Sequence, residues 1–138
     1  MKIFLDANVL VAVLNKEYPL FSNAARILSL GANSKYKIYT SPICLAIAFY
    51  FVEKKHGTIA AKEKINLLAS NIFITDVGND TVLASLQNKK VNDFEDGLEY
   101  YSAQKSKCTL IITEDVNDFY FSEMEVLKSK DFVEKYLV

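Results

Sequence analysis

Glycine and proline are scarce in this chain, whose 138 residues include four glycines and two prolines. So few flexible or kinked positions leave little room for disordered segments or long linkers. Hydrophobic residues make up 51% of the sequence and charged residues 24%, which is ordinary for a globular protein. We therefore expect residues 1–138 to form a single domain that buries roughly two-thirds of its unfolded surface.

Cysteine and histidine are also rare, and their scarcity argues against a zinc site. The two cysteines, Cys44 and Cys108, lie within apolar runs, and His56 is the only histidine. Structural zinc sites are built from about four Cys or His ligands. We expect both cysteines to be buried, reduced thiols instead.

The sequence has no excess of positive charge that would mark it as a nucleic-acid-binding protein. Its formal net charge is −1, so contact with a nucleic acid would have to come from a local patch or a bound cation. No apolar run is long enough to cross a bilayer, and the first residues, with Asp6 and Asn8 among them, are unlike a signal peptide. A cytoplasmic protein without membrane contact is the expectation.

Short apolar runs alternate with segments of helical periodicity along the chain. The apolar runs predict four strands, at residues 2–6, 37–40, 72–75 and 109–113. The periodic segments predict helices at residues 8–16, 22–30, 42–55, 58–70, 79–88, 93–106 and 129–137. Strands separated by helices favour right-handed crossover connections. The sequence therefore predicts an α/β fold with a central parallel sheet.

Three aspartates stand where predicted elements begin or end. Asp6 closes the first strand, Asp115 follows the fourth, and Asp96 lies in the first turn of the helix at 93–106. Because the carboxyl ends of parallel strands share one edge of a sheet, we expect these carboxylates to converge. Converging acids repel one another unless a cation neutralises them, and a few oxygen ligands suit Mg²⁺ or Mn²⁺. The pattern predicts phosphodiester hydrolysis assisted by such an ion.

Each of these acids also has a purely structural interpretation. Asp6 could cap the helix that follows it, and Asp93 is better placed to cap its helix than to bind a metal. Asp96 could complement the helix dipole, whereas Asp115 and Asp118 could be turn residues after a strand. The recurrence of acids at compatible ends of elements favours a metal site over these alternatives.

Four stretches of the chain resemble the PIN-domain family. They are FLDANVL at residues 4–10, SPICLA at 41–46, DFEDGLEY at 93–100 and IITEDVNDF at 111–119. The resemblance implies a three-layer α/β/α sandwich and a Mg²⁺- or Mn²⁺-dependent ribonuclease similar to the VapC-like toxins of type II toxin–antitoxin modules. It also implies an RNA substrate, a small antitoxin protein as partner and a homodimer.

The resemblance assigns roles residue by residue. It makes Asp6, Asp96 and Asp115 the catalytic acids that hold the metal. Supporting positions fall to an amide, a hydroxyl and an outer acid: Asn8, Thr113 and Asp118. Asp93 precedes Asp96 by three residues and would share its helical face, which makes it a further supporting candidate.

The chain departs from the family pattern at Ile47, where PIN enzymes usually carry a glutamate. Glu53 is the nearest acid on that helix, but its spacing places it on another face. A missing ligand or orienting carboxylate can lower metal affinity or activity by about 10–100-fold. A catalytically degenerate PIN module that binds nucleic acid or protein is therefore an alternative. A receiver-like or small phosphatase fold with an acidic pocket is a third hypothesis.

Overall fold

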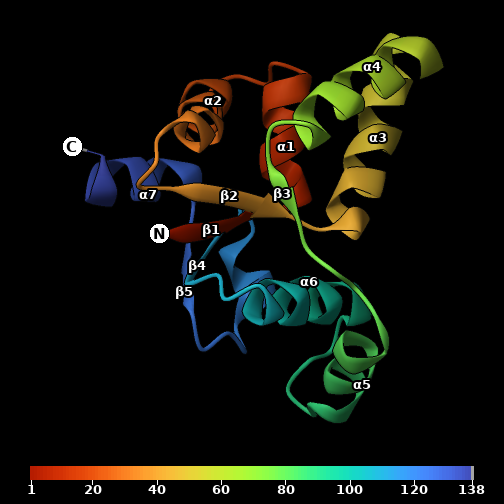
Figure 1. Cartoon of the computed structure of the whole chain (residues 1–138), viewed down its shortest axis with the longest axis vertical. Helices are drawn as coiled ribbons and strands as arrows, with labels where there is room; N and C mark the ends of the chain where they lie inside the picture. The colour runs from red at the N-terminus through yellow and green to blue at the C-terminus, as the bar shows by residue number, and fades with distance from the viewer. Residues whose placement is uncertain (138) are drawn as a thin grey trace.

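Five parallel strands form the centre of the computed structural model, which describes residues 1–137 (Figure 1). The strands are β1 (Lys2–Leu5), β2 (Lys37–Thr40), β3 (Phe73–Ile74), β4 (Leu110–Ile112) and β5 (Glu125–Leu127). Their order across the sheet is β3-β2-β1-β4-β5, and each neighbouring pair is parallel. The prediction of a parallel sheet is confirmed.

Strand β1 is central because its side chains are apolar on both faces. Ile3, Phe4 and Leu5 are fully buried, as expected for a strand covered on both sides. Ile3 is in register with Ile38 of β2 and with Leu110 of β4. The four predicted strands are all present. The prediction missed β5, a three-residue edge strand whose residues are only partly buried.

Seven helices accompany the described strands, close to their predicted positions. They are α1 (Ala7–Leu14), α2 (Phe21–Ser29), α3 (Pro42–His56), α4 (Thr58–Ala69), α5 (Asn79–Gln87), α6 (Phe94–Lys105) and α7 (Ser129–Tyr136), with short 3₁₀ turns η1 (Leu30–Ala32) and η2 (Val116–Phe119). Helices α1 and α2 lie on one side of the sheet and α5 and α6 on the other (Figure 1). This arrangement is the expected α/β sandwich. None of the helices within residues 1–137 is long and apolar enough to cross a membrane.

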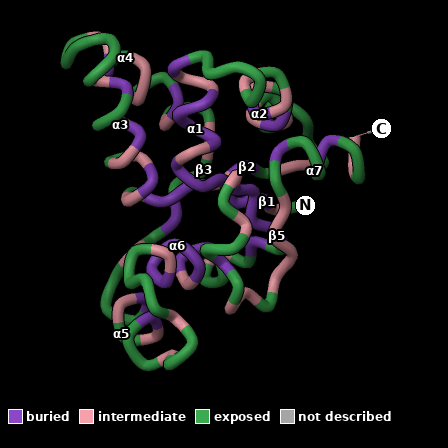
Figure 2. The backbone as a smooth tube through the Cα atoms, turned by 180° about the vertical axis from the view of Figure 1, so that it is seen from behind, coloured by how far each residue is buried: buried purple, intermediate pink, exposed green. Residues whose placement is uncertain are grey.

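The buried core follows β1 and the first turns of α1 and continues into α6 (Figure 2). Helix α6 packs closely on α5 because it carries Gly97 at the crossing. A Cβ atom on Gly97 would come within 2.8 Å of Val91 Cγ1 and 2.9 Å of Ser85 Cβ. The glycine thus fixes how near α6 lies to α5, and with it the direction of the neighbouring Asp96.

The order of the strands creates a crevice at the carboxyl edge of the sheet. From β1 the chain adds β2 and then β3 on one side, and later adds β4 and β5 on the other. Ligand sites in open α/β sheets lie where this direction reverses, which is here between β1 and β4. The residues that follow these two strands, beginning at Asp6 and Thr113, therefore meet at the crevice.

Candidate metal centre

Asp6 links the end of β1 to the start of α1. It is the N-cap of α1, and its Oδ1 accepts a hydrogen bond from the Ala7 amide at 2.7 Å. Its Oδ2 accepts a hydrogen bond from the Thr113 hydroxyl at 2.8 Å. The side chain is 9% exposed and lines a cavity. The capping interpretation is confirmed, and the same cap holds the carboxylate at the crevice.

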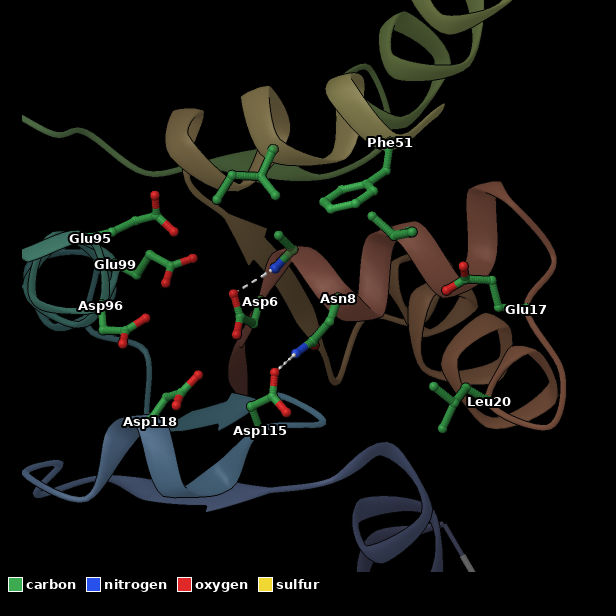
Figure 3. Close-up of a pocket in the computed structure, with 13 residues that line it drawn as sticks. Asp6, Asn8, Glu17, Leu20, Phe51, Glu95, Asp96, Glu99, Asp115 and Asp118 are labelled. Carbon is green, nitrogen blue, oxygen red and sulfur yellow. Dashed lines mark hydrogen bonds between the residues drawn. The ribbon is translucent and has the colours of Figure 1, made fainter. Parts of the chain in front are cut away.

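A polar network joins Asp6 to the loop after β4, and Figure 3 shows one of its hydrogen bonds, from Asn8 to Asp115. The Asn8 amide donates to Thr113 Oγ1 at 3.2 Å and to Asp115 Oδ2 at 3.3 Å, and it accepts from the Glu114 amide. The Asp115 amide also donates to Thr113 Oγ1, at 3.1 Å. The Thr113 oxygen accepts hydrogen bonds from Asn8 and from the Asp115 amide. A hydroxyl group has a single proton to donate, and Thr113 donates it to Asp6.

Helix α6 brings further acids from the opposite side of the crevice. Asp93 is its N-cap and accepts a hydrogen bond from the Asp96 amide at 3.2 Å. Asp96, half-buried, and Glu99, buried, follow on the same face and point toward the cavity (Figure 3). The prediction that Asp93 caps the helix is confirmed. Asp93 does not line the cavity.

The cavity has a volume of about 410 Å³ and is lined largely by acids. The lining carboxylates are Asp6, Glu17, Glu95, Asp96, Glu99, Asp115 and Asp118. No lysine, arginine or histidine within residues 1–137 lines it. The ion pairs found in the same range involve none of these acids. The negative charge of the cavity is therefore not balanced by a neighbouring basic side chain.

Burial and crowding make the inner acids hard to ionise. Burial, followed by repulsion from Asp93 and Asp118, raises the pKa of Asp96 to about 7. Burial, followed by repulsion from Asp6, raises the pKa of Glu99 to about 10. At the rim, burial is also the main cause that raises the pKa of Asp118. A divalent cation would relieve this crowding by favouring the charged carboxylates.

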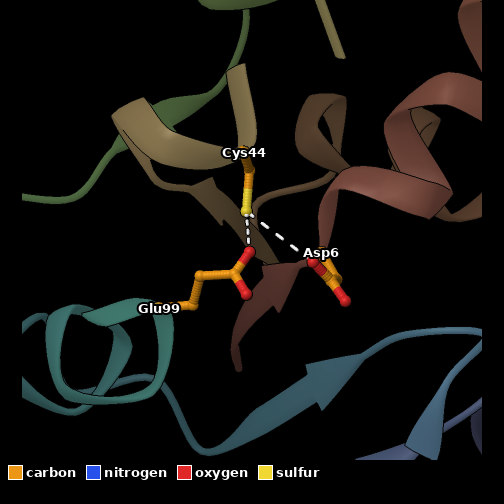
Figure 4. Close-up of side chains that lie close together, drawn as sticks. All are labelled: Asp6, Cys44 and Glu99. Atoms are coloured by element: carbon orange, nitrogen blue, oxygen red, sulfur yellow. Dashed lines mark hydrogen bonds between the residues drawn. The ribbon is translucent and has the colours of Figure 1, made fainter. Parts of the chain in front are cut away.

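Glu99, like Glu17 and Glu95, lines the cavity without being among the predicted site residues. It is 1% exposed and accepts a hydrogen bond from the Cys44 thiol, on the first turn of α3 (Figure 4). Burial, followed by repulsion from Glu99, raises the pKa of Cys44, so Cys44 remains a thiol. Cys44 and Cys108 are both buried and unbridged, as expected. Glu99 lies three residues after Asp96, a helical spacing that could have signalled a second acid on that face.

The structure brings most of the predicted site residues to one place. Asp6, Asn8, Asp96, Asp115 and Asp118 all line the cavity. Thr113 is fully buried behind them and holds Asp6 in place. The donor set consists of hard oxygen ligands without a competing cation, so it fits a divalent ion such as Mg²⁺ or Mn²⁺.

Comparisons with known proteins agree with this architecture. The sequence model of the PIN domain matches residues 2–117. The chain is also similar to a curated protein from Aquifex aeolicus (strain VF5) named Ribonuclease VapC1. The two are 27% identical over 142 aligned residues, which cover 98% of this chain and 95% of the relative.

Three solved structures share the fold. A chain of VapBC2 from Rickettsia felis, bound to a promoter DNA fragment, has a TM-score of 0.68 and 20% identity, covering 93% of this chain and 98% of that one. VapC20 from Mycobacterium tuberculosis, a sarcin–ricin loop cleaving toxin, has a TM-score of 0.66 and 18% identity, and the match covers 89% of this chain and 98% of that one. A chain of VapBC-1 from nontypeable Haemophilus influenzae has a TM-score of 0.69 and 15% identity, and the match covers 94% of this chain and 99% of that one.

The raised pKa values predict how the stability of the metal-free protein depends on pH. An acid whose folded pKa is raised stabilises the fold while it is protonated, and this stability is lost as pH rises toward the folded value. We expect the melting temperature in EDTA to fall between pH 5.5 and pH 8, the range in which Asp96 titrates with its pKa of about 7. Asp96→Asn should make this fall shallower without removing it, because Glu99, with its pKa of about 10, stays protonated in the folded protein over the whole range. Excess Mn²⁺ should raise the melting temperature more at pH 8 than at pH 5.5.

Differential scanning fluorimetry of both proteins over this pH range measures the effect. Asp131→Asn, at an exposed position on α7, is the matched control and should keep the wild-type slope. A wild-type melting temperature that is flat or rises over this range would contradict the crowding of acids described here.

Proposed function

The chain belongs to the PIN-domain family, and from that premise we propose that it is a divalent-metal-dependent endoribonuclease that hydrolyses RNA phosphodiester bonds. The observation that carries the proposal is the cavity at the switch between β1 and β4. Acids that follow β1 and β4 converge there with acids of α6, and no basic side chain within residues 1–137 lines it. The relative from Aquifex aeolicus, named a ribonuclease, supports RNA as the substrate.

Asp6, Asp96 and Asp115 would hold the ion, which we propose to be Mg²⁺ or Mn²⁺. When bound, such an ion lowers the pKa of a coordinated water, orients the phosphodiester and stabilises developing negative charge. Asp6 is buried whereas Asp115 is exposed, so the three acids span the depth of the cavity. The exposed side leaves room for the phosphate to approach, and the ion would offset the repulsion between phosphate and carboxylates.

The remaining predicted residues would act by positioning these acids. Thr113 directs its proton to Asp6 Oδ2, which leaves Asp6 fixed in orientation. Asn8 holds Asp115 through its side-chain amide. Asp118 lies at the exposed rim of the cavity, where it can orient water, and Asp93 fixes the start of α6 and thereby the place of Asp96.

We further propose that the protein is the toxin of a toxin–antitoxin module, with a small antitoxin protein as partner and a homodimeric state. Two of the similar structures are of VapBC proteins, and a third protein is described as a toxin. Large apolar side chains on α3 and α4 are exposed, among them Tyr50, Phe51 and Leu67, which is typical of surfaces that another protein covers. Light scattering of the purified chain would test the dimer, because a mass of 15.6 kDa would contradict it.

The ribonuclease activity is tested with fluorogenic single-stranded RNA and total cellular RNA in Mg²⁺, Mn²⁺ or EDTA. We expect cleavage in one or both metals and none in EDTA. Asp96→Asn should lower the rate by about 100-fold or more, because it removes a ligand. Its melting temperature should equal or exceed that of the wild type, because acid crowding is relieved.

The exposed control Asp131→Asn should cleave at the wild-type rate. Cleavage that persists in EDTA or in Asp96→Asn would overturn the assignment of the site. Failure of the wild-type protein to cleave either RNA in any metal would overturn the proposed activity.

A further inference from the structure

The two helices that face each other across the cavity contribute opposite kinds of side chain. Helix α3 presents Ile47 and Phe51 to the cavity, and both are apolar. Helix α6 presents Glu99 from the other side, where its carboxylate points toward Asp6 (Figures 3 and 4). Of these two facing helices, only α6 therefore contributes a carboxylate to the inner part of the cavity.

Glu99 lies close enough to Asp6 to share a ligand with it. The possible ligand atoms of Asp6, Cys44 and Glu99 all lie within 4.8 Å of one another. Cys44 Sγ donates to Glu99 Oε1 and lies 3.9 Å from Asp6 Oδ1. The Glu99 carboxyl group is also hydrogen-bonded to Asp6, and this hydrogen bond adds to burial in raising its pKa. One oxygen of this almost fully buried side chain is thus held by a thiol, and the carboxyl group as a whole faces the acid Asp6 rather than a basic side chain.

A buried carboxyl group in this place is unfavourable for the fold alone. Glu99 is 1% exposed and stands beside the buried Asp6, and no basic side chain within the described residues lines the cavity. Burying an acid beside another acid without a basic partner costs free energy, so an amide or apolar side chain would suit packing better. The position makes physical sense if a cation occupies the space between the two carboxylates.

We propose that Glu99 is a metal ligand of this centre, with Oε2 bound to the same divalent ion as Asp6, and that Cys44 positions it through Oε1. The inference rests on the proposed function, because it assigns a further ligand to the same ion. It also accounts for Ile47, because Glu99 of α6 supplies the carboxylate that this position of α3 lacks. The ion would then be held by Asp6 after β1, by Asp96 and Glu99 on successive turns of α6, and by Asp115 in the loop after β4.

The test is isothermal titration of the RNA-free protein with Mn²⁺ at fixed pH. Glu99→Gln preserves shape and removes the charge, and we expect it to weaken Mn²⁺ binding by about 10–100-fold. Glu53→Gln is the matched control on α3. Glu53 accepts a hydrogen bond from Thr58 and does not line the cavity, so this variant should bind Mn²⁺ within about two-fold of the wild type. Asp6→Asn should abolish binding.

The outcomes separate this inference from the function on which it rests. Unchanged Mn²⁺ affinity in folded Glu99→Gln, with binding lost in Asp6→Asn, would overturn the role of Glu99 and leave the metal centre intact. A wild-type protein that binds no Mn²⁺ would overturn both. If Glu99→Gln fails to fold, Glu99→Asp decides, because it keeps the charge but shortens the reach. Weaker binding would support the proposal, and unchanged binding would overturn it.

Discussion

Uncompensated negative charge at the carboxyl edge of β1 and β4 is the constraint around which this protein is organised. Asp6 and Glu99 are buried there and Asp96 is half-buried, yet no basic side chain in the described chain lines their cavity. Burial and mutual repulsion raise the pKa of Asp96 to about 7 and that of Glu99 to about 10. The folded state can keep these groups together only with bound protons or a bound cation. Folding, pH dependence and metal binding are therefore coupled through one set of carboxylates.

Secondary structure and site share the same residues, which explains how so many acids are held in place. Asp6 caps α1 with one oxygen and receives the Thr113 proton on the other. Asp93 caps α6 and so fixes the first turn, where Asp96 lies. Helix capping satisfies backbone amides that the helix leaves free, and here it also orients carboxylates toward the crevice. Removing such an acid would affect the local fold as well as the chemistry, so isosteric changes from Asp to Asn are the informative ones.

The sequence was sufficient for those parts of the site that follow from local rules. An apolar run ending at Asp6 and another before Asp115, joined by helices, imply parallel strands whose ends meet, and the structure places both acids at one cavity. The spacing of Glu99 three residues after Asp96 places both acids on one face of α6. How closely that face approaches Asp6 depends on tertiary packing, in which Gly97 brings α6 against α5. The missing glutamate at Ile47 belongs to α3, whereas Glu99, which we propose takes its place, lies across the cavity on α6. Strand β5 was missed because three partly buried residues at a sheet edge give almost no periodic signal.

The most direct test of the central claim is to locate the ion in crystals of the wild-type protein soaked in Mn²⁺, by anomalous diffraction. We expect one strong peak in the cavity, with carboxylate oxygens of Asp6 and Asp96 at the distances usual for hard divalent ions, about 2.0–2.6 Å. Such a peak would show that the crowded acids are a metal centre. A cavity without a peak in crystals grown near pH 8, or a peak bonded only to acids outside it, would contradict the account.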